Sequence, residues 1–253
     1  MIGYVEGRSP LHRAHPYTTL TLAGAVLFAA FAMTEPATVW LLVLAGAALA
    51  ATGGVLRSSA RTALLLSLPI WALLFVLHGL LGGGARFALG PLSLSAPGIA
   101  RGLVLGGRVT AIVLSFLTAL ATTSPHRLVE AMTARGVPFG RTFLLASTLT
   151  VLPRMRERAA RILEAQQCRG LRLGGSLVAR VRALGPLALP LILGALAEVD
   201  EQVLALDVRG AAAVGRRTAL DAPSDTAVQR TLRWGLLIVV AAAYAWKFWR
   251  MRG

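Results

Sequence analysis

The stretch from residue 153 to residue 210 contains two polar segments that end alike, PRMRERAARILEAQQCRG (153–170) and GALAEVDEQVLALDVRG (194–210). Each finishes in an arginine followed by a glycine, and the two arginines lie forty positions apart, in Cys168-Arg169-Gly170 and in Val208-Arg209-Gly210. Long apolar runs precede and follow the stretch. The pattern therefore predicts two polar helices that are held in place by membrane spans.

The composition indicates an integral membrane protein. Of the 253 residues, 56% are hydrophobic and 15% are charged, whereas soluble proteins carry about 25% charged residues. The net charge of +15 does not predict nucleic-acid binding, because the arginines are not spread over a soluble face with stacking aromatic residues. Sixteen of the 25 arginines lie between Arg127 and Arg233, beside apolar runs, as the positive-inside rule describes.

Five apolar runs predict transmembrane helices: Tyr17–Met33, Thr38–Leu56, Thr62–Leu81, Leu103–Ala121 and Trp234–Trp249. Each is close to the ~20 residues that cross a bilayer core as a helix, and a helix pairs all its backbone groups within one segment. The first run lacks a convincing cleavage site, so we expect a retained span. The predicted fold is an all-α polytopic membrane protein.

The predicted organisation has three regions along the chain. Residues 1–122 form a four-span N-terminal bundle, residues 123–230 form a polar region with two helices at 153–170 and 194–210, and residues 231–253 form the last span. The two helices have opposite charge, since the first carries an arginine stripe at helical spacing and the second is acidic. We therefore expect them to pack as a crossed pair with complementary charges at the edges.

The arginine distribution predicts the orientation. Arg8 and Arg13 place the N-terminus in the cytoplasm, and Arg57 and Arg61 bring the second turn to the same side. The two polar helices are expected there as well. Three cations at or beyond the end of the last span would then lie outside, against the rule, so the side of the C-terminus stays open: Lys247, Arg250 and Arg252.

Polar residues near or inside the spans have structural explanations. His12 and His15 precede the first span and are expected to form a cationic membrane anchor. His78 is expected to donate an interhelical hydrogen bond. Arg108 lies within an apolar run, where a charge is a functional candidate, but its position near the helix start favours snorkelling to the interface.

Three glycines open the fourth apolar run. Gly102 and Gly106 have small-xxx-small spacing, and Gly107 follows them. Such glycines allow two helices to approach closely. We expect them to serve packing within the chain rather than binding of a partner.

Signatures of enzyme and carrier chemistry are missing from the sequence. It contains no Gly-x-x-x-x-Gly-Lys-Ser/Thr phosphate loop, no His-Glu-x-x-His motif and no paired carboxylates in a span. A single cysteine excludes internal disulfides and a cysteine-rich metal site. The spans lack the acidic residues expected of an ion-coupled carrier. We expect no cofactor or metal, and any transport would take its energy from a partner.

The two Arg-Gly ends have two explanations. A glycine in the left-handed conformation ends a helix, and a cation in the last turn suits the helix dipole. The alternative is binding, because arginine offers a rigid fork of donors that pairs with carboxylates. The duplication favours binding: Arg169 and Arg209 are expected to insert into acidic grooves on two ATPase subunits, one each.

Several segments resemble the transmembrane coupling subunit, or T component, of energy-coupling factor transporters, a family that includes the cobalt-type CbiQ proteins. The similar segments are His15-Pro-Tyr-Thr-Thr-Leu, Thr122-Thr-Ser-Pro-His-Arg-Leu-Val-Glu-Ala, Gly136-Val-Pro, Val151–Gly170 and Pro186–Gly210. The family ends each coupling helix with Ala-Arg-Gly or a similar triplet. The matching residues here are Cys168, Arg169, Gly170, Val208, Arg209 and Gly210, with the usual alanine replaced in both triplets.

The resemblance implies a scaffold that binds two ABC ATPase subunits and a substrate-binding membrane subunit, the S component, for uptake of a vitamin or a transition-metal ion. It implies no chemistry on this chain. The literal triplet Ala134-Arg135-Gly136 lies on a different helix and is not expected to be a coupling end. Two alternatives stay open: a membrane enzyme that uses His126 and Glu130, and a passive scaffold or ordinary permease domain.

Overall fold

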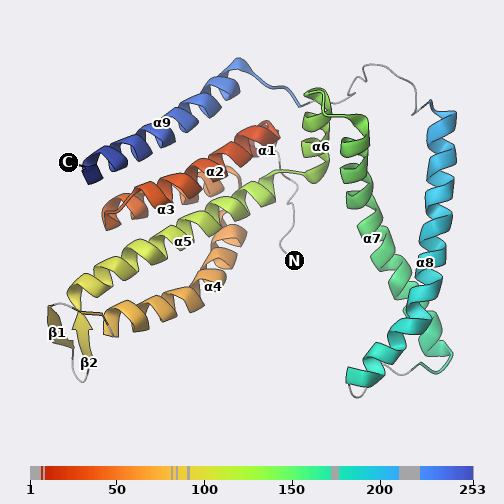
Figure 1. Cartoon of the computed structure of the whole chain (residues 1–253), viewed down its shortest axis with the longest axis horizontal. Coiled ribbons are helices and arrows are strands. Elements are labelled where there is room, and N and C mark those ends of the chain that lie inside the picture. Colours follow the sequence, from red (N-terminus) through yellow and green to blue (C-terminus); the bar gives the residue numbers. More distant parts are fainter. Residues whose placement is uncertain are drawn as a thin grey trace. The chain divides into compact units, whose positions relative to one another are not determined.

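The computed structural model describes residues 7, 9–80, 82–83, 85–89, 92–171, 177–210 and 223–252. Helices make up nearly all of the described chain (Figure 1), so the predicted all-α class is confirmed. The chain divides into two compact units, Met1–Ala131 with Asp221–Gly253, and Met132–Leu220.

The first unit contains the membrane helices α2 (Pro16–Ala32), α3 (Pro36–Thr52), α4 (Leu56–Leu74), α5 (Ala96–Thr122) and α9 (Ala227–Arg252). The helix α4 continues into a π-helical turn, η1 (Phe75–Leu80). Among the described residues, α4 with η1, α5 and α9 are long and apolar enough to cross a membrane, and α2 and α3 are apolar with 17 residues each. The chain is therefore a multi-pass membrane protein.

The short elements of this unit lie at the chain turns. The helix α1 (Pro10–Arg13) precedes α2. A hairpin of β1 (Arg86–Leu89) and β2 (Leu92–Ser95) connects η1 to α5, with antiparallel pairing. The helix α5 begins at Ala96, directly after β2. Ser95 caps it by accepting a hydrogen bond from the backbone N–H of Gly98 at 3.2 Å.

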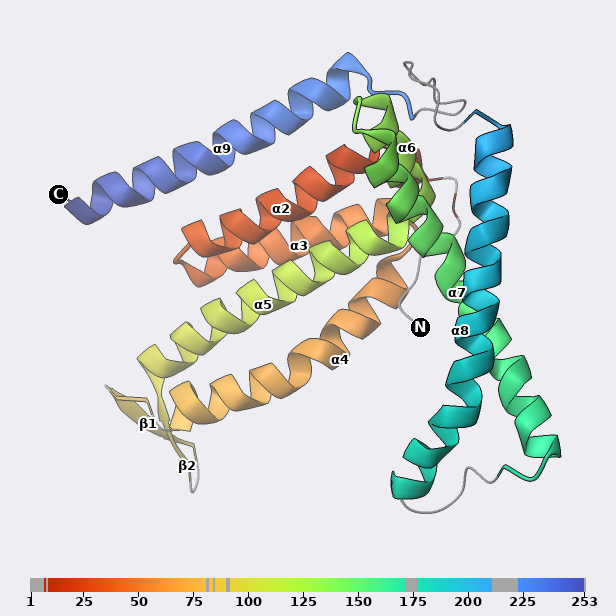
Figure 2. The ribbon, with the colours of Figure 1, turned by 45° about the vertical axis from the view of Figure 1, so that its right-hand side comes forward.

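The centre of the first unit is α5, which packs against α2, α3 and α4, while α9 lies along α2 (Figure 2). Small residues permit the close approach. A β-carbon on Gly106 would lie 2.6 Å from the ring of Trp71, and one on Gly107 would lie 2.9 Å from Val39. The predicted role of these two glycines in packing within the chain is confirmed.

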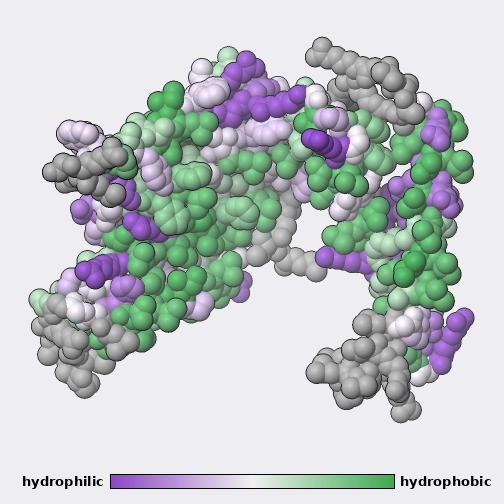
Figure 3. Space-filling view, viewed as in Figure 1, coloured by the Kyte–Doolittle hydropathy of each residue, from purple (hydrophilic) through white to green (hydrophobic). Residues whose placement is uncertain are grey.

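The outer faces of these helices are apolar. Four leucines on α4 are more than half exposed: Leu64, Leu65, Leu68 and Leu73. Figure 3 shows hydrophobic side chains over much of the visible surface of the membrane helices. Exposed leucine on one helix after another is stable against lipid chains and not against water. This surface is the one that the composition predicted.

The second unit contains two long helices, α7 (Phe139–Cys168) and α8 (Leu177–Val208). The polar segments predicted from 153 and from 194 are the second halves of these helices, which begin earlier in apolar sequence. Pro153 lies inside α7. A proline removes one backbone hydrogen bond, which kinks a helix more often than it ends one when helix-forming residues follow. The connection at 172–176 and the linker at 211–222 lie outside the described residues.

The helix α6 (Pro125–Ala134) begins directly after Ser124. Ser124 accepts a hydrogen bond from the backbone N–H of Arg127 at 3.3 Å, as an N-cap does. Pro125 occupies the first helical position. The boundary between the two compact units falls within α6, after Ala131.

Candidate functional site

The end of α7 is a complete Schellman motif. Gly170 has a φ of +92°, in the left-handed region. Its N–H donates to the carbonyl of Gln167 at 2.9 Å, and the N–H of Leu171 donates to the carbonyl of Gln166 at 3.0 Å. These two bonds satisfy carbonyls that the last turn of a helix leaves unpaired.

The end of α8 has the same local geometry. Gly210 has a φ of +67°, and its N–H donates to the carbonyl of Asp207 at 3.0 Å. The end of α6 also matches, since Gly136 has a φ of +79° and donates to the carbonyl of Thr133 at 3.0 Å. A left-handed glycine that ends the helix is therefore present at all three Arg-Gly ends. This geometry does not distinguish Arg135 from the predicted coupling arginines.

The two predicted ends are accessible. The side chains of Arg169 and Arg209 are exposed, as is that of Cys168. Val208 is 89% exposed. Within the described residues, neither guanidinium forms a hydrogen bond or an ion pair.

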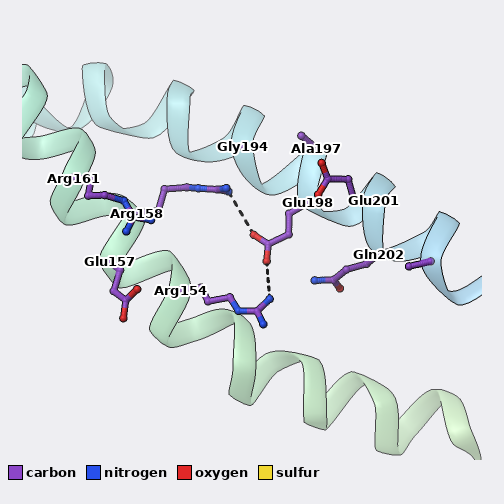
Figure 4. A pocket seen from close by; sticks show the side chains of 10 residues that line it. Arg154, Glu157, Arg158, Arg161, Gly194, Ala197, Glu198, Glu201 and Gln202 are labelled. Atoms are coloured by element: carbon purple, nitrogen blue, oxygen red, sulfur yellow. Dashed lines mark hydrogen bonds and ion pairs between the residues drawn. The ribbon is translucent and has the colours of Figure 1, made fainter.

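The helices α7 and α8 cross at a shared carboxylate. Arg154 Nη1 lies 3.3 Å from Glu198 Oε1, and Arg158 Nη1 lies 3.5 Å from Glu198 Oε2 (Figure 4). Gly194 makes room for this contact, because a β-carbon there would lie 2.9 Å from Arg158 Nη1. The predicted crossed pair with complementary charges is confirmed.

A charged cleft of about 610 Å³ lies beside this contact. Arginines on α7 and glutamates on both helices line it: Arg154, Arg158, Arg161, Glu157, Glu198 and Glu201. Three positive and three negative side chains leave the cleft without net charge. Because its positive and negative side chains balance, the cleft is a contact between the two helices rather than a site for a charged ligand.

The crossing also fixes where the two arginine tips lie. Gln166 Nε2 donates to the carbonyl of Pro186 at 3.5 Å, and Arg154 contacts Glu198, so the helices run in opposite directions. The C-terminal ends of α7 and α8 consequently lie at opposite ends of the pair (Figure 1). At 1.5 Å per residue, Arg169 and Arg209 are separated by about 40 Å along it.

The first unit holds a polar cluster at the start of α9. Arg233 is only 8% exposed. It donates to both carboxylate oxygens of Asp225, at 2.8 and 2.7 Å, and to Thr18 Oγ1 at 3.0 Å. The hydrogen bond from Arg233 lowers the pKa of Asp225, although partial burial opposes the shift. No local pattern in the sequence indicates the contact between Arg233 and Thr18, because the two residues are 215 positions apart.

The N-terminal segment belongs to the same cluster. His12 is 5% and His15 is 3% exposed, so the prediction of a cationic membrane anchor is wrong. The backbone N–H of His15 donates to Gln229 Oε1 at 2.9 Å, and Arg127 donates to the carbonyls of His12 and Arg13. These histidines fix the turn before α2 to the starts of α6 and α9.

Two residues inside the spans also differ from expectation. Arg108 Nη2 donates to the carbonyl of Met33 at 2.7 Å, so Arg108 caps the end of α2, a contact that the sequence did not indicate. Within the described residues His78 forms no side-chain hydrogen bond, and its Nδ1 is buried without a partner. The predicted interhelical hydrogen bond of His78 is therefore wrong.

The residues of the enzyme alternative form a surface pair. His126 Nε2 lies 3.3 Å from Glu130 Oε1, one turn away on α6, and the histidine is largely exposed. This is the spacing of an ordinary stabilising pair on a helix. In the part of the chain that the structure describes, no group of three or more His, Cys, Asp or Glu side chains is placed to hold a metal ion.

The fold defines an all-α, multi-pass membrane protein with a pair of crossed polar helices. The chain belongs to the CbiQ family, described as cobalt transport protein, whose model matches residues 7–216. It is 31% identical over 222 residues to the energy-coupling factor transporter transmembrane protein EcfT of Brevibacillus brevis, with 82% of each chain covered. It is 30% identical over 223 residues to the EcfT of Thermanaerovibrio acidaminovorans, covering 81% of this chain and 80% of that one.

A further relative has a different name. The chain is 27% identical over 252 residues to a putative ABC transporter ATP-binding protein of Bifidobacterium longum, and the match covers 94% of this chain but 32% of that protein. Together these comparisons identify the chain as a transmembrane component of an energy-coupling factor type ABC transporter.

Proposed function

We propose that this chain is the non-catalytic scaffold that transmits ATP binding and hydrolysis in two partner ATPases to a substrate-binding membrane subunit. The cargo would be a vitamin or a transition-metal ion. Arg169 and Arg209 are the contacts to the ATPases, one each, with the flanking residues shaping each tip: Cys168, Gly170, Val208 and Gly210. Residues 123–230 then act as the coupling region.

The observation that carries this proposal is the placement of two exposed arginines at opposite ends of one crossed helix pair. A pair of tips about 40 Å apart suits two separate partner bodies better than one. Each guanidinium offers a planar set of donors that matches a carboxylate with two hydrogen bonds. A movement of either partner would turn its helix about the crossing at Glu198.

The Bifidobacterium longum relative supports the choice of ATPases as partners. That protein is named as an ATP-binding protein of an ABC transporter, and it contains a stretch similar to almost the whole of this chain. In that polypeptide the two parts are covalently joined. We infer that here the same association forms between separate chains.

Charge supports a cytoplasmic location for the N-terminus and the two tips. Arg8 and Arg13 precede the first span, and the positive-inside rule assigns such residues to the cytoplasm, where ATP is available. The substrate-binding subunit would contact the apolar faces of the membrane helices. Passage of the cargo would follow a tilt of that subunit, driven through α7 and α8.

Co-purification with the ATPases tests the proposal. The native chain should retain two ATPase subunits, as measured by light scattering of the purified complex. Arg169→Ala and Arg209→Ala should each weaken retention, and the double variant should abolish both retention and ATP-driven uptake in proteoliposomes. Arg135→Ala is the matched control, because Arg135 precedes a glycine with the same cap geometry.

Two results would contradict the proposed coupling role of Arg169 and Arg209. If the double variant assembles and transports as the native chain does, the two arginines serve only as helix ends. If Arg135→Ala is as damaging as the tip variants, the effect comes from loss of charge and not from the tips.

A further inference from the structure

A second pocket lies in the first unit, at the turn between α2 and α3. It has a volume of about 370 Å³, within the range of small-ligand sites. Two arginines of α5 and nearby small or aliphatic residues line it: Arg101, Arg108, Val104, Leu105, Thr34 and Pro36. The lining thus combines two cations with a hydrocarbon surface.

Within the described residues, neither arginine of this pocket forms an ion pair, although Glu35 lies between the lining residues Thr34 and Pro36. Arg108 donates one hydrogen bond, to the Met33 carbonyl, and its Nε is buried without a partner. The side chain of Arg101 is exposed and, within the described residues, has no hydrogen-bond or ion-pair partner. Two guanidinium groups next to an apolar membrane helix raise the free energy of the folded protein unless an anion accompanies them.

The position along α5 places the pocket at the surface of a bilayer. A helix of 27 residues is about 40 Å long, roughly 10 Å more than the hydrocarbon core. Arg101 is the sixth residue of α5, about 8 Å from its start, close enough to the edge of the hydrocarbon core for its long side chain to reach the lipid headgroups. Side chains of a helix tilt towards its N-terminus, so Arg108 extends from two turns deeper towards Arg101.

We propose that this pocket binds the headgroup of an anionic phospholipid. The phosphate oxygens accept hydrogen bonds from Arg101 and Arg108, and one acyl chain lies over Val104 and Leu105. Charge complementarity selects the anion, and the aliphatic half of the lining selects a lipid over a free phosphate ion. The bound lipid would stabilise the turn after α2, where Arg108 already holds the Met33 carbonyl.

Native mass spectrometry of the full-length chain tests the proposal. The chain is released from detergent and titrated with phosphatidylglycerol, with phosphatidylcholine of the same acyl chains, or with inorganic phosphate. Because each charge-assisted hydrogen bond contributes about a tenfold change in affinity, we expect phosphatidylglycerol to bind at least about tenfold more tightly than phosphatidylcholine. The double variant R101Q/R108Q should lose that preference.

The matched control is R57Q/R61Q, which removes two exposed arginines of α4 and therefore the same charge. It should keep the preference. Arg101→Gln alone breaks no hydrogen bond among the described residues and should weaken binding about tenfold, so the test stands even if variants of Arg108 do not fold. Arg108→Lys should retain part of the affinity, because lysine keeps the charge but loses the fork.

Three results would overturn the assignment. One is equal binding of the two lipids by the native chain. Another is an unchanged preference in R101Q/R108Q, or an equal loss in R57Q/R61Q, since both would mean general attraction to the surface. The third is binding of inorganic phosphate as tight as that of phosphatidylglycerol, which would make the site one for free anions. None of these measurements involves the ATPases, so they are independent of the proposed coupling role.

Discussion

Arg233 donates two hydrogen bonds to the carboxylate of Asp225, at 2.8 and 2.7 Å, from a side chain that is 8% exposed. The same guanidinium donates to Thr18 of α2. Further polar contacts join the two segments, from Tyr244 to the Phe28 carbonyl, from Lys247 to the Phe31 carbonyl and from the backbone N–H of His15 to Gln229. In lipid, apolar helix surfaces have little preference for each other over acyl chains. These polar contacts, with the buried Arg233 among them, therefore help to set how α9 lies against α2.

Removal of Asp225 should destabilise the protein. In Asp225→Ala the buried guanidinium keeps its charge without a counter-ion, and breaking a buried pair in this way costs about 3–5 kcal/mol. Because Asp225 is itself partly exposed, we expect about 2 kcal/mol. Thermal unfolding in detergent measures the effect. Asp207→Ala, which removes an exposed carboxylate, is the control, and an equal loss in both variants would contradict a role of the pair.

The same pair predicts a pH dependence. The hydrogen bond from Arg233 lowers the pKa of Asp225 in the folded protein, while the unfolded value is about 3.9. A lowered folded pKa means that the stabilisation is fully present above the unfolded value and is lost as the pH falls through the folded value. The difference in melting temperature between native protein and Asp225→Asn should be constant from pH 7 to about pH 5 and shrink below about pH 4. A difference that is unchanged or larger in strong acid would refute this origin.

Loss of the shared carboxylate at the helix crossing should uncouple transport from ATP hydrolysis. In Glu198→Ala, Arg154 and Arg158 repel each other across the joint instead of sharing an anion. Partly exposed pairs contribute about 1 kcal/mol or less each, so the chain should fold and retain its ATPases. The number of substrates taken up per ATP should fall several-fold. Glu201→Ala removes a glutamate from the same cleft and should leave the number of substrates per ATP near that of the native complex. Equal numbers in both variants would contradict a role of the Glu198 crossing in coupling.

A methyl group at Gly106 should disturb the helix bundle. The added carbon would lie 2.6 Å from the Trp71 ring, closer than any stable contact, and Trp71 is held in place by its hydrogen bond to Thr110 at 3.1 Å. Overpacking of this kind costs about 1–3 kcal/mol, so Gly106→Ala should lower the melting temperature. Gly24→Ala is the matched control, because a β-carbon there meets no atom within 4 Å. A result in which both variants melt alike would mean that α4 and α5 separate at little cost.

Much of the fold was predictable because the signals are local. The length and polarity of each apolar run predict a span, Ser124-Pro125 predicts the start of α6, and each Arg-Gly pair predicts a helix end with a left-handed glycine. The opposite charges of the two polar helices predict their pairing. Local rules were less reliable at Pro153, which lies inside α7 rather than at its start.

The sequence by itself determined which segments are membrane helices, where the helices stop and which two arginines carry the duplicated ends. Only the tertiary structure decided that Arg169 and Arg209 lie at opposite ends of one crossed pair, and that His15 is buried against Gln229, 214 positions away. The physical reason is the distance along the sequence between the residues that interact. A cap or a span depends on residues within a few turns, whereas burial and ion pairing depend on which distant helix supplies the partner, and no periodicity in the chain records that choice.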